Sequence, residues 1–316
     1  MSTIQSEQSP QAGIGVELTP ELLRKRRGQL RIIFDRFIRN KVAVAGLVVL
    51  ALITLAAIFA PVITHQTATF DPNTATDVYH IASGPFPGHP LGTDYVGRDE
   101  VARLLFGARV SLLVGLASML ASIFIGVSVG ALAGYYGGWL DNLMMRITDA
   151  FLAIPLYLIL FVLAATFTTG SGSASVIGVI VLIAAFSWPA TARIVRGEFL
   201  GLKEREFLLA ARTLGANDFR LMLRHILPNA AGPVIVAATL LVGFNIITES
   251  TLSFFNFGVQ PPESSWGTML ATSQDYFSEQ PLLVLIPGLA ILITVLSINL
   301  VGDGLRDALD PYMTER

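Results

Sequence analysis

Long apolar runs alternate with short polar segments along the 316-residue chain. Six of these runs are about as long as the roughly 20 residues that an α-helix needs to cross a bilayer. They cover residues 42–63, 110–134, 143–165, 176–195, 233–255 and 282–301. The pattern predicts an all-α polytopic membrane protein with six transmembrane helices.

The segment before the first run has a different pattern. Residues 1–18 are polar and rich in Ser, Gln and Gly, and residues 24–27 form a basic cluster. Apolar residues then recur on one face of a helix, at Leu30, Ile33, Phe34, Phe37 and Ile38. We therefore expect residues 1–41 to form a tail and an interfacial helix that contacts lipid at the cytoplasmic leaflet. Nucleic-acid binding by the basic cluster is the alternative, and the transmembrane runs that follow disfavour it.

Composition agrees with a membrane protein, because 53% of the residues are hydrophobic and 14% are charged, against roughly 25% charged in soluble domains. Cysteine is absent, which excludes disulfides and thiolate metal sites. Of the 21 Lys and Arg residues, only Arg98, Arg103 and Arg109 fall on the side opposite to the N-terminus. Since cytoplasmic loops carry the excess of basic residues, we expect both termini in the cytoplasm and the chain in the plasma membrane.

The loop at about residues 203–228 is a charged island between two apolar runs. It contains Ala210 and Ala211, then Gly215, and Pro228 near its end. Two alanines leave a bare helix surface that another protein can approach closely, and a glycine at the end supplies a left-handed C-cap. This spacing resembles the EAA loop of ABC-transporter permease subunits.

The resemblance implies that the loop couples the chain to a cytoplasmic ATPase. The residues that it assigns to this coupling are Glu206, Phe207, Ala210, Ala211, Arg212, Gly215 and Pro228. One position departs from the family, because the acidic residue directly before the two alanines is Leu209 here. Glu206 lies one helical turn earlier on roughly the same face, and it is the residue that can replace the lost contact.

Further segments of the sequence narrow the resemblance to one group of ABC-transporter permeases. They are HPLGTD at 89–94 with GRD at 97–99, QPPESSWGTML at 260–270, and GDGLRDALDP at 302–311. They look like the permeases of the dipeptide, oligopeptide and nickel group of ABC importers. That resemblance makes residues 42–316 a permease domain with the type I importer fold. It also implies a second permease chain, two ATPase subunits that hold ATP and Mg, and an external substrate-binding protein.

The resemblance implies no cofactor on this chain. Short peptides are the first expectation for the substrate, with nickel chelates or oligosaccharides as alternatives. The residues expected to dock the external binding protein are His89, Asp94, Arg98, Asp99 and Trp266. Without the family, the Pro, Gly and Asp residues of this loop are turn residues, and Arg98 beside Asp99 is a surface ion pair worth little. A single His without further ligands does not make a metal site, so no metal is expected.

The fifth run contains the polar residues expected in a substrate pathway, Asn245, Thr248 and Glu249. An ionisable residue near the membrane is a functional candidate, and we expect Glu249 to reach external water at the end of the run.

Other features of the runs concern packing. Small residues at intervals of four within 115–130 predict close approach of helices. Pro155 and Pro189 permit kinks, and Asp149 is expected to pair with Arg146, three residues earlier on the same helix.

Two other classes of function compete with an importer subunit. A secondary transporter is expected to bury charged residues near mid-membrane and to contain internal repeats, and neither is visible in this sequence. A membrane-bound enzyme needs a constellation of nucleophile, metal or base, and the zinc motif HExxH is absent. The phosphate loop GxxxxGK[ST] is absent as well. We therefore expect a transport subunit that is not itself an enzyme.

Overall fold

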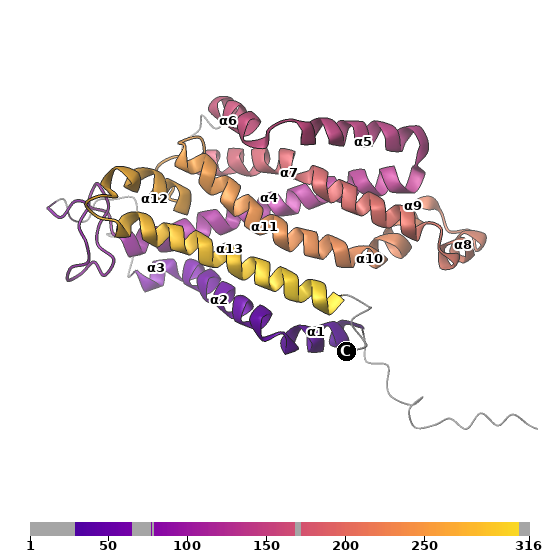
Figure 1. The fold of residues 1–316 in the computed structure, drawn as a ribbon, viewed down its shortest axis with the longest axis horizontal. Helices are drawn as coiled ribbons and strands as arrows, with labels where there is room; N and C mark the ends of the chain where they lie inside the picture. Colours follow the sequence, from indigo (N-terminus) through magenta and orange to yellow (C-terminus); the bar gives the residue numbers. More distant parts are fainter. Residues whose placement is uncertain (1–28, 65–76, 78, 168–171, 310–316) are drawn as a thin grey trace, which may run out of the picture.

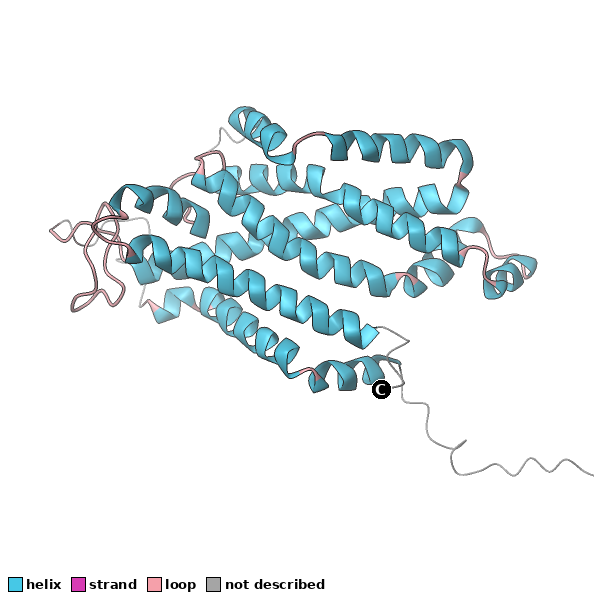
Figure 2. Cartoon of the chain, viewed as in Figure 1, coloured by secondary structure: helices cyan, strands magenta, loops and turns pink. Residues whose placement is uncertain are grey.

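The computed structural model describes residues 29–64, 77, 79–167 and 172–309, and this part of the chain is mostly helical (Figure 2). Within it, five continuous helices are long and apolar enough to cross a membrane. They are α2 (Lys41–Ile58), α4 (Glu100–Tyr136), α7 (Ser173–Leu202), α11 (Ala231–Phe254) and α13 (Leu282–Leu309). These helices confirm the first, second, fourth, fifth and sixth predicted spans.

Shorter helices connect the long ones or extend from them. They are α1 (Gln29–Arg39), α3 (Ala60–Ile63), α5 (Gly138–Ala153), α6 (Leu156–Phe167), α8 (Glu206–Thr213), α9 (Asp218–Arg220), the π-helix η1 (Leu221–Ile226), α10 (Leu227–Asn229), α12 (Trp266–Ser273) and the 3-10 helix η2 (Gln274–Tyr276).

The third predicted span is broken. Helices α5 and α6 meet at an angle of 85°, so the kink that Pro155 is expected to permit within 143–165 is present, as a break between two helices. Pro155 stands at the break, and Ile154 before it has an extended backbone with ψ of 130°. Proline disfavours a helical conformation of the residue that precedes it and has no N–H to donate. Pro189, in contrast, lies inside the continuous helix α7.

Two ion pairs hold α5 against α7. Arg196 contacts both carboxylate oxygens of Asp141, at 2.5 and 2.6 Å. Arg193 contacts Asp149 at 2.5 Å. The prediction that Asp149 pairs with Arg146 on its own helix is therefore wrong, since the partner comes from the next long helix.

The small residues of α4 let α7 approach closely, as the spacing predicts. Cβ atoms added to Gly126, Gly130 and Gly134 would lie 2.8 Å from Thr191 Cβ, 2.4 Å from the carbonyl oxygen of Ala192 and 2.6 Å from Phe199 Cβ, respectively. Contacts below 3.0 Å require the neighbouring atoms to move. The three glycines are spaced four residues apart, so they line one face of α4 and fix it along α7.

Residues 126–130 also spell GxSxG, a motif of serine nucleophiles. That motif acts at a sharp turn between a strand and a helix. Here the segment lies within α4, and Ser128 is exposed and donates a hydrogen bond to the carbonyl oxygen of Phe124 at 2.7 Å. The match is therefore a packing segment and not a nucleophile site.

Helix α1 is the described part of the predicted interfacial helix, and residues 1–28 of that prediction lie outside the described residues. Phe34 and Ile38 are 61% and 51% exposed, so apolar side chains of α1 remain uncovered by the rest of the described chain. Asn40 separates α1 from α2, and its side-chain oxygen accepts a hydrogen bond from the backbone N–H of Ala43 at 3.1 Å. This cap explains why the chain turns between an interfacial and a spanning helix.

Different short helices and loops lie at the two ends of the bundle (Figure 1). Helix α1, the end of α13 and helices α8 to α10 lie toward one end, and α3, α12 and the loop before α4 lie toward the other. The basic loop predicted for coupling is thus on the same side as α1, and the loop predicted for docking is on the opposite side.

Candidate functional site

Helix α8 lies within the loop that is predicted to couple the chain to an ATPase. Gly215 follows it with φ of +84°, a conformation that glycine adopts without the steric cost of a Cβ atom. The backbone N–H of Ala216 donates to the carbonyl oxygen of Ala211 at 3.2 Å, and that of Gly215 donates to Arg212 at 3.0 Å. These two bonds form a Schellman motif, so the prediction of a left-handed C-cap is confirmed.

The two faces of α8 have different surroundings. Leu208 is 4% exposed and packs in a cluster with Phe199 and Leu221, and Ala211 packs against the edge of that cluster. Ala210 is exposed. Of the two alanines, therefore, only Ala210 lies on the open face of the helix.

Large apolar side chains in and after α8 are exposed. The exposed fractions are 44% for Phe207, 54% for Leu209, 88% for Leu214 and 67% for Phe219. These residues give a segment rich in charge several exposed apolar side chains. Leu214 and Phe219 were not singled out from the sequence. Leu209 was considered there only as the position where the family has an acidic residue.

The chain returns to the bundle through an irregular helix. Asn217 caps α9, since its side-chain oxygen accepts a hydrogen bond from the N–H of Arg220 at 2.8 Å. In η1 the bonding pattern widens, and the N–H of Leu227 donates to Met222, five residues earlier. Pro228, predicted in the coupling set, follows in α10 and is exposed. Because proline has no N–H to donate, it cannot continue the hydrogen bonding of an ordinary α-helix. This agrees with the irregular helix at this position.

In the opposite loop, Asp94 is fully buried and organises the turn around it. Its carboxylate accepts hydrogen bonds from the backbone N–H groups of Val96 and Arg98, at 3.0 and 2.8 Å. It also forms ion pairs with Arg98, at 2.6 Å, and with Arg103 of α4. Arg98 therefore pairs with Asp94 and not with Asp99, and this pair is not on the open surface as the sequence suggested.

The other residues predicted for docking also bind within the chain. His89 Nδ1 lies 2.7 Å from Asp99 Oδ2, and the second oxygen of Asp99 caps α4 by accepting from the N–H of Ala102 at 2.7 Å. Trp266 is 1% exposed, and its indole N–H donates to the carbonyl oxygen of Leu104 at 3.1 Å. These residues shape the loop. In the described part of the loop, the exposed large apolar side chains are different ones, Tyr79, Ile81 and Val96.

At the start of this loop, Asp77 accepts hydrogen bonds from the backbone N–H groups of Tyr79 and His80, at 3.0 and 3.2 Å. The hydrogen bond with the His80 ring is the main cause that lowers the pKa of the Asp77 carboxyl. The carboxylate is therefore kept charged, and it fixes the backbone beside exposed Tyr79.

The polar residues predicted for the pathway are buried between helices. Glu249 has no exposed surface, so the expectation that it reaches external water is wrong. Its carboxylate accepts hydrogen bonds from Ser111 at 3.0 Å and Ser253 at 2.8 Å. Asn245 donates to Ser118 of α4 at 2.9 Å, and Thr248 donates to the carbonyl oxygen of Phe244 within α11. The contacts of Glu249 with Ser111 and of Asn245 with Ser118 hold α11 to α4, while those of Ser253 and Thr248 lie within α11.

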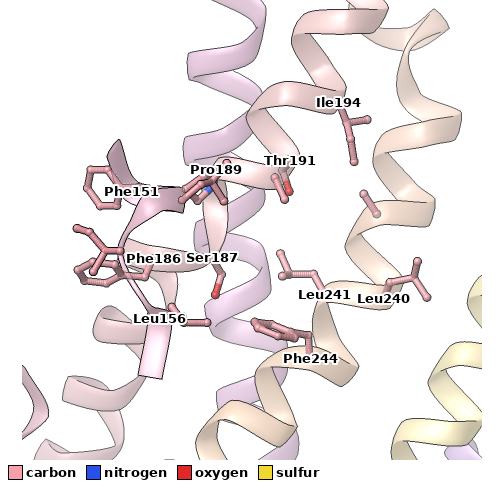
Figure 3. Close-up of a pocket in the computed structure, with 14 residues that line it drawn as sticks. Phe151, Leu156, Phe186, Ser187, Pro189, Thr191, Ile194, Leu240, Leu241 and Phe244 are labelled. Atoms are coloured by element: carbon pink, nitrogen blue, oxygen red, sulfur yellow. The ribbon is translucent and has the colours of Figure 1, made fainter. Parts of the chain in front are cut away.

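A cavity of about 400 Å³ lies beside the break between α5 and α6 (Figure 3). Side chains from this break, from α7 and from α11 line it, including Phe151, Leu156, Phe186, Ile194, Leu241 and Phe244. Its few polar side chains include Ser187 and Thr191. The predicted pathway residues Asn245, Thr248 and Glu249 are not among the residues that line this cavity.

Comparison with known proteins agrees with this fold. Residues 126–315 match the family model described as "Binding-protein-dependent transport system inner membrane component". Residues 28–85 match a second model, "N-terminal TM domain of oligopeptide transport permease C". The fold and these matches define a multi-pass transport protein of the inner membrane. The chain belongs to the family of binding-protein-dependent transport system inner membrane components, the permease subunits of ABC importers.

Several relatives are similar over most of their length. A glutathione transport system permease protein of Pectobacterium atrosepticum is 43% identical, over 90% of this chain and 91% of its own. An oligopeptide transport system permease protein of Bacillus subtilis is 40% identical, over 88% of both chains. A dipeptide transport system permease protein of Alkalihalophilus pseudofirmus is 38% identical, over 89% of both chains.

A solved structure of the MetNI methionine ABC transporter in an inward-facing conformation has the same fold. Its chain is 22% identical and superposes with a TM-score of 0.54, over 66% of this chain and 96% of its own. This likeness confirms the type I importer fold.

Proposed function

We propose that the chain forms half of the translocation pathway of an importer for short peptides. The observation that carries the proposal is the similarity, over about nine-tenths of the chain, to permease proteins named for glutathione, dipeptide and oligopeptide transport. A second permease chain, an external substrate-binding protein and two cytoplasmic ATPase subunits complete the assembly. Both termini of this chain face the cytoplasm in this proposal, and the distribution of Lys and Arg supports this orientation.

ATP and Mg bind to the partner subunits in this proposal. The sequence has no GxxxxGK[ST] phosphate loop of its own, so the chain alone does not hydrolyse ATP. The exposed face of α8, with Phe207, Leu209, Ala210 and Leu214, is the surface that enters a groove of an ATPase. The small side chain of Ala210 permits close approach to the ATPase, and its apolar neighbours supply apolar area that is buried in the contact.

The cavity beside the broken span fits a pathway for peptides. Irregular backbone at membrane depth is tolerated where it lines a cavity or is covered by protein. The apolar lining of this cavity accommodates varied side chains without a fixed charge that would hold the substrate. Selection of the peptide is then left mainly to the external binding protein.

Uptake into proteoliposomes tests the proposal. The complete complex is reconstituted with its binding protein, and accumulation of labelled dipeptide, tripeptide, nickel chelate and oligosaccharide is compared with and without ATP inside. We expect ATP-dependent accumulation of the peptides alone. Uptake of only the chelate or the sugar would overturn the peptide assignment, and uptake without ATPase subunits would overturn the importer assignment.

A further inference from the structure

Tyr135, in the last turn of α4, contacts two charged residues of the loop that contains α8. Its hydroxyl group donates a hydrogen bond to Asp218 Oδ1 at 2.6 Å. The same oxygen accepts a hydrogen bond from Arg212 Nη2 at 3.0 Å. Arg212 and Asp218 are themselves 3.7 Å apart, so the phenol lies between them as a bridge.

The ring of Tyr135 is anchored while its hydroxyl group is engaged. Tyr135 is 8% exposed and belongs to the apolar cluster that also contains Phe199 of α7 and Leu208 of α8. At the preceding residue, Gly134, an added Cβ atom would lie 2.6 Å from Phe199 Cβ. Movement of the hydroxyl group therefore moves the end of α4, and α7 moves with it.

We propose that Tyr135 is a positioning residue that transmits the displacement of α8 to the paired helices α4 and α7. This inference rests on the proposed function, because it needs an ATPase that moves α8. Arg212 is at the C-terminal end of α8 and Asp218 is at the start of α9. Tyr135 thus joins both sides of the Gly215 turn to one spanning helix. Hydrogen bonds to charged groups are stronger than neutral ones, which suits a contact that must persist during movement.

The neighbouring tyrosine provides a matched control. Tyr136 is 52% exposed, and its ring meets that of Tyr135 edge to face with centroids 5.2 Å apart. Replacement of either tyrosine by Phe keeps the ring and removes one hydroxyl group. Only Tyr135→Phe removes the two contacts to Arg212 and Asp218.

The test measures peptide uptake and ATP hydrolysis in the same proteoliposomes, made from the intact complex with its binding protein. We expect Tyr135→Phe to assemble normally and to reduce the peptide imported per ATP hydrolysed about fivefold or more, as the loss of two charge-assisted hydrogen bonds implies. Tyr136→Phe should keep the wild-type ratio. Asp218→Asn, which keeps a side-chain oxygen as acceptor, should retain more of the ratio than Asp218→Ala.

An unchanged ratio in Tyr135→Phe would overturn the inference. Loss of ATPase association in that variant would overturn it too, because Tyr135 would then shape the docking surface and not transmit movement. Failure of the wild-type complex to import peptide would instead overturn the proposed function.

Discussion

Ser111 of α4 donates a hydrogen bond to the carboxylate of Glu249 in α11 at 3.0 Å, across a sequence separation of 138 residues. The same serine oxygen accepts a hydrogen bond from the backbone N–H of Trp266 at 3.2 Å. Ser253 donates to the other oxygen of Glu249 at 2.8 Å. The buried carboxylate and the serine that binds it therefore join α4, α11 and α12 at one end of the bundle.

This relationship predicts a stability defect. Glu249→Ala leaves the hydroxyl groups of Ser111 and Ser253 without their acceptor in a buried site, at a cost of about 2 to 3 kcal/mol. We expect a lower thermal unfolding midpoint for the purified complex in detergent, and a smaller decrease for Glu249→Gln. Thr251→Ala, on the same helix with a hydroxyl that bonds only within its own helix, is the control. Equal midpoints for Glu249→Ala and wild type would contradict the structural role.

The buried ion pairs of the loop before α4 give a second prediction. Asp94→Ala leaves Arg103, whose side chain is 5% exposed, without its partner. Removal of one partner of a buried pair costs about 3 to 5 kcal/mol, so we expect the loop to become sensitive to external protease and to lose affinity for the binding protein. Asp275→Ala changes an exposed acid after α12 and should have no effect. Protease resistance equal to wild type in Asp94→Ala would rule out this organisation of the loop.

The turn after α8 gives a third prediction. At this turn, the steric effect of an added side chain can be distinguished from the effect of a positive φ. A Cβ atom added at Gly215 meets no atom within 4 Å, so any defect must come from the positive φ. A β-branched residue strongly disfavours this region, and Asn tolerates it. We expect Gly215→Val to weaken association with the ATPase while Gly215→Asn stays near wild type, as measured by co-purification at matched membrane levels. Equal loss in both variants would mean that another property of glycine is needed.

A fourth prediction concerns sidedness. Because the chain has no cysteine, single cysteines report accessibility directly. Ser278 and Leu214 are exposed. Ser278 follows η2 after α12, and Leu214 caps α8, and α12 and α8 lie toward opposite ends of the bundle (Figure 1). In sealed cells, an impermeant thiol reagent should label Ser278→Cys, and it should label Leu214→Cys only after the membrane is opened. External labelling of Leu214→Cys would invert the orientation.

The fold follows from sequence wherever periodicity and local chemistry decide it. Apolar runs predict the long helices, the glycine spacing of α4 predicts its close contact with α7, and the position of Gly215 predicts its left-handed turn. The break of the third span has a local cause as well, in Pro155. Its angle of 85° does not follow from one residue, because packing against α7 and the ion pairs of α5 also set it.

The arrangement of polar residues does not follow in the same way. Glu249 and Ser111 are far apart in sequence, and so are Tyr135 and Asp218, so no local pattern connects them. Arg98 stands beside Asp99 in the sequence, yet the turn around Asp94 brings Arg98 to a different acid. Contacts between distant segments decide whether a charged residue is buried or exposed. From the sequence alone, Glu249 and Asp94 are both expected to be exposed.

The most direct test of coupling through α8 changes its exposed alanine. Ala210→Asp adds bulk and a charge on the open face, where burial of an unpaired charge against an ATPase costs several kcal/mol, while Ala210→Ser adds one atom. ATP-driven uptake of labelled dipeptide is measured in proteoliposomes containing equal amounts of each complex. We predict that Ala210→Ser transports near the wild-type rate and that Ala210→Asp loses most uptake. Transport by Ala210→Asp at the wild-type rate would contradict the assignment of α8 as the coupling helix.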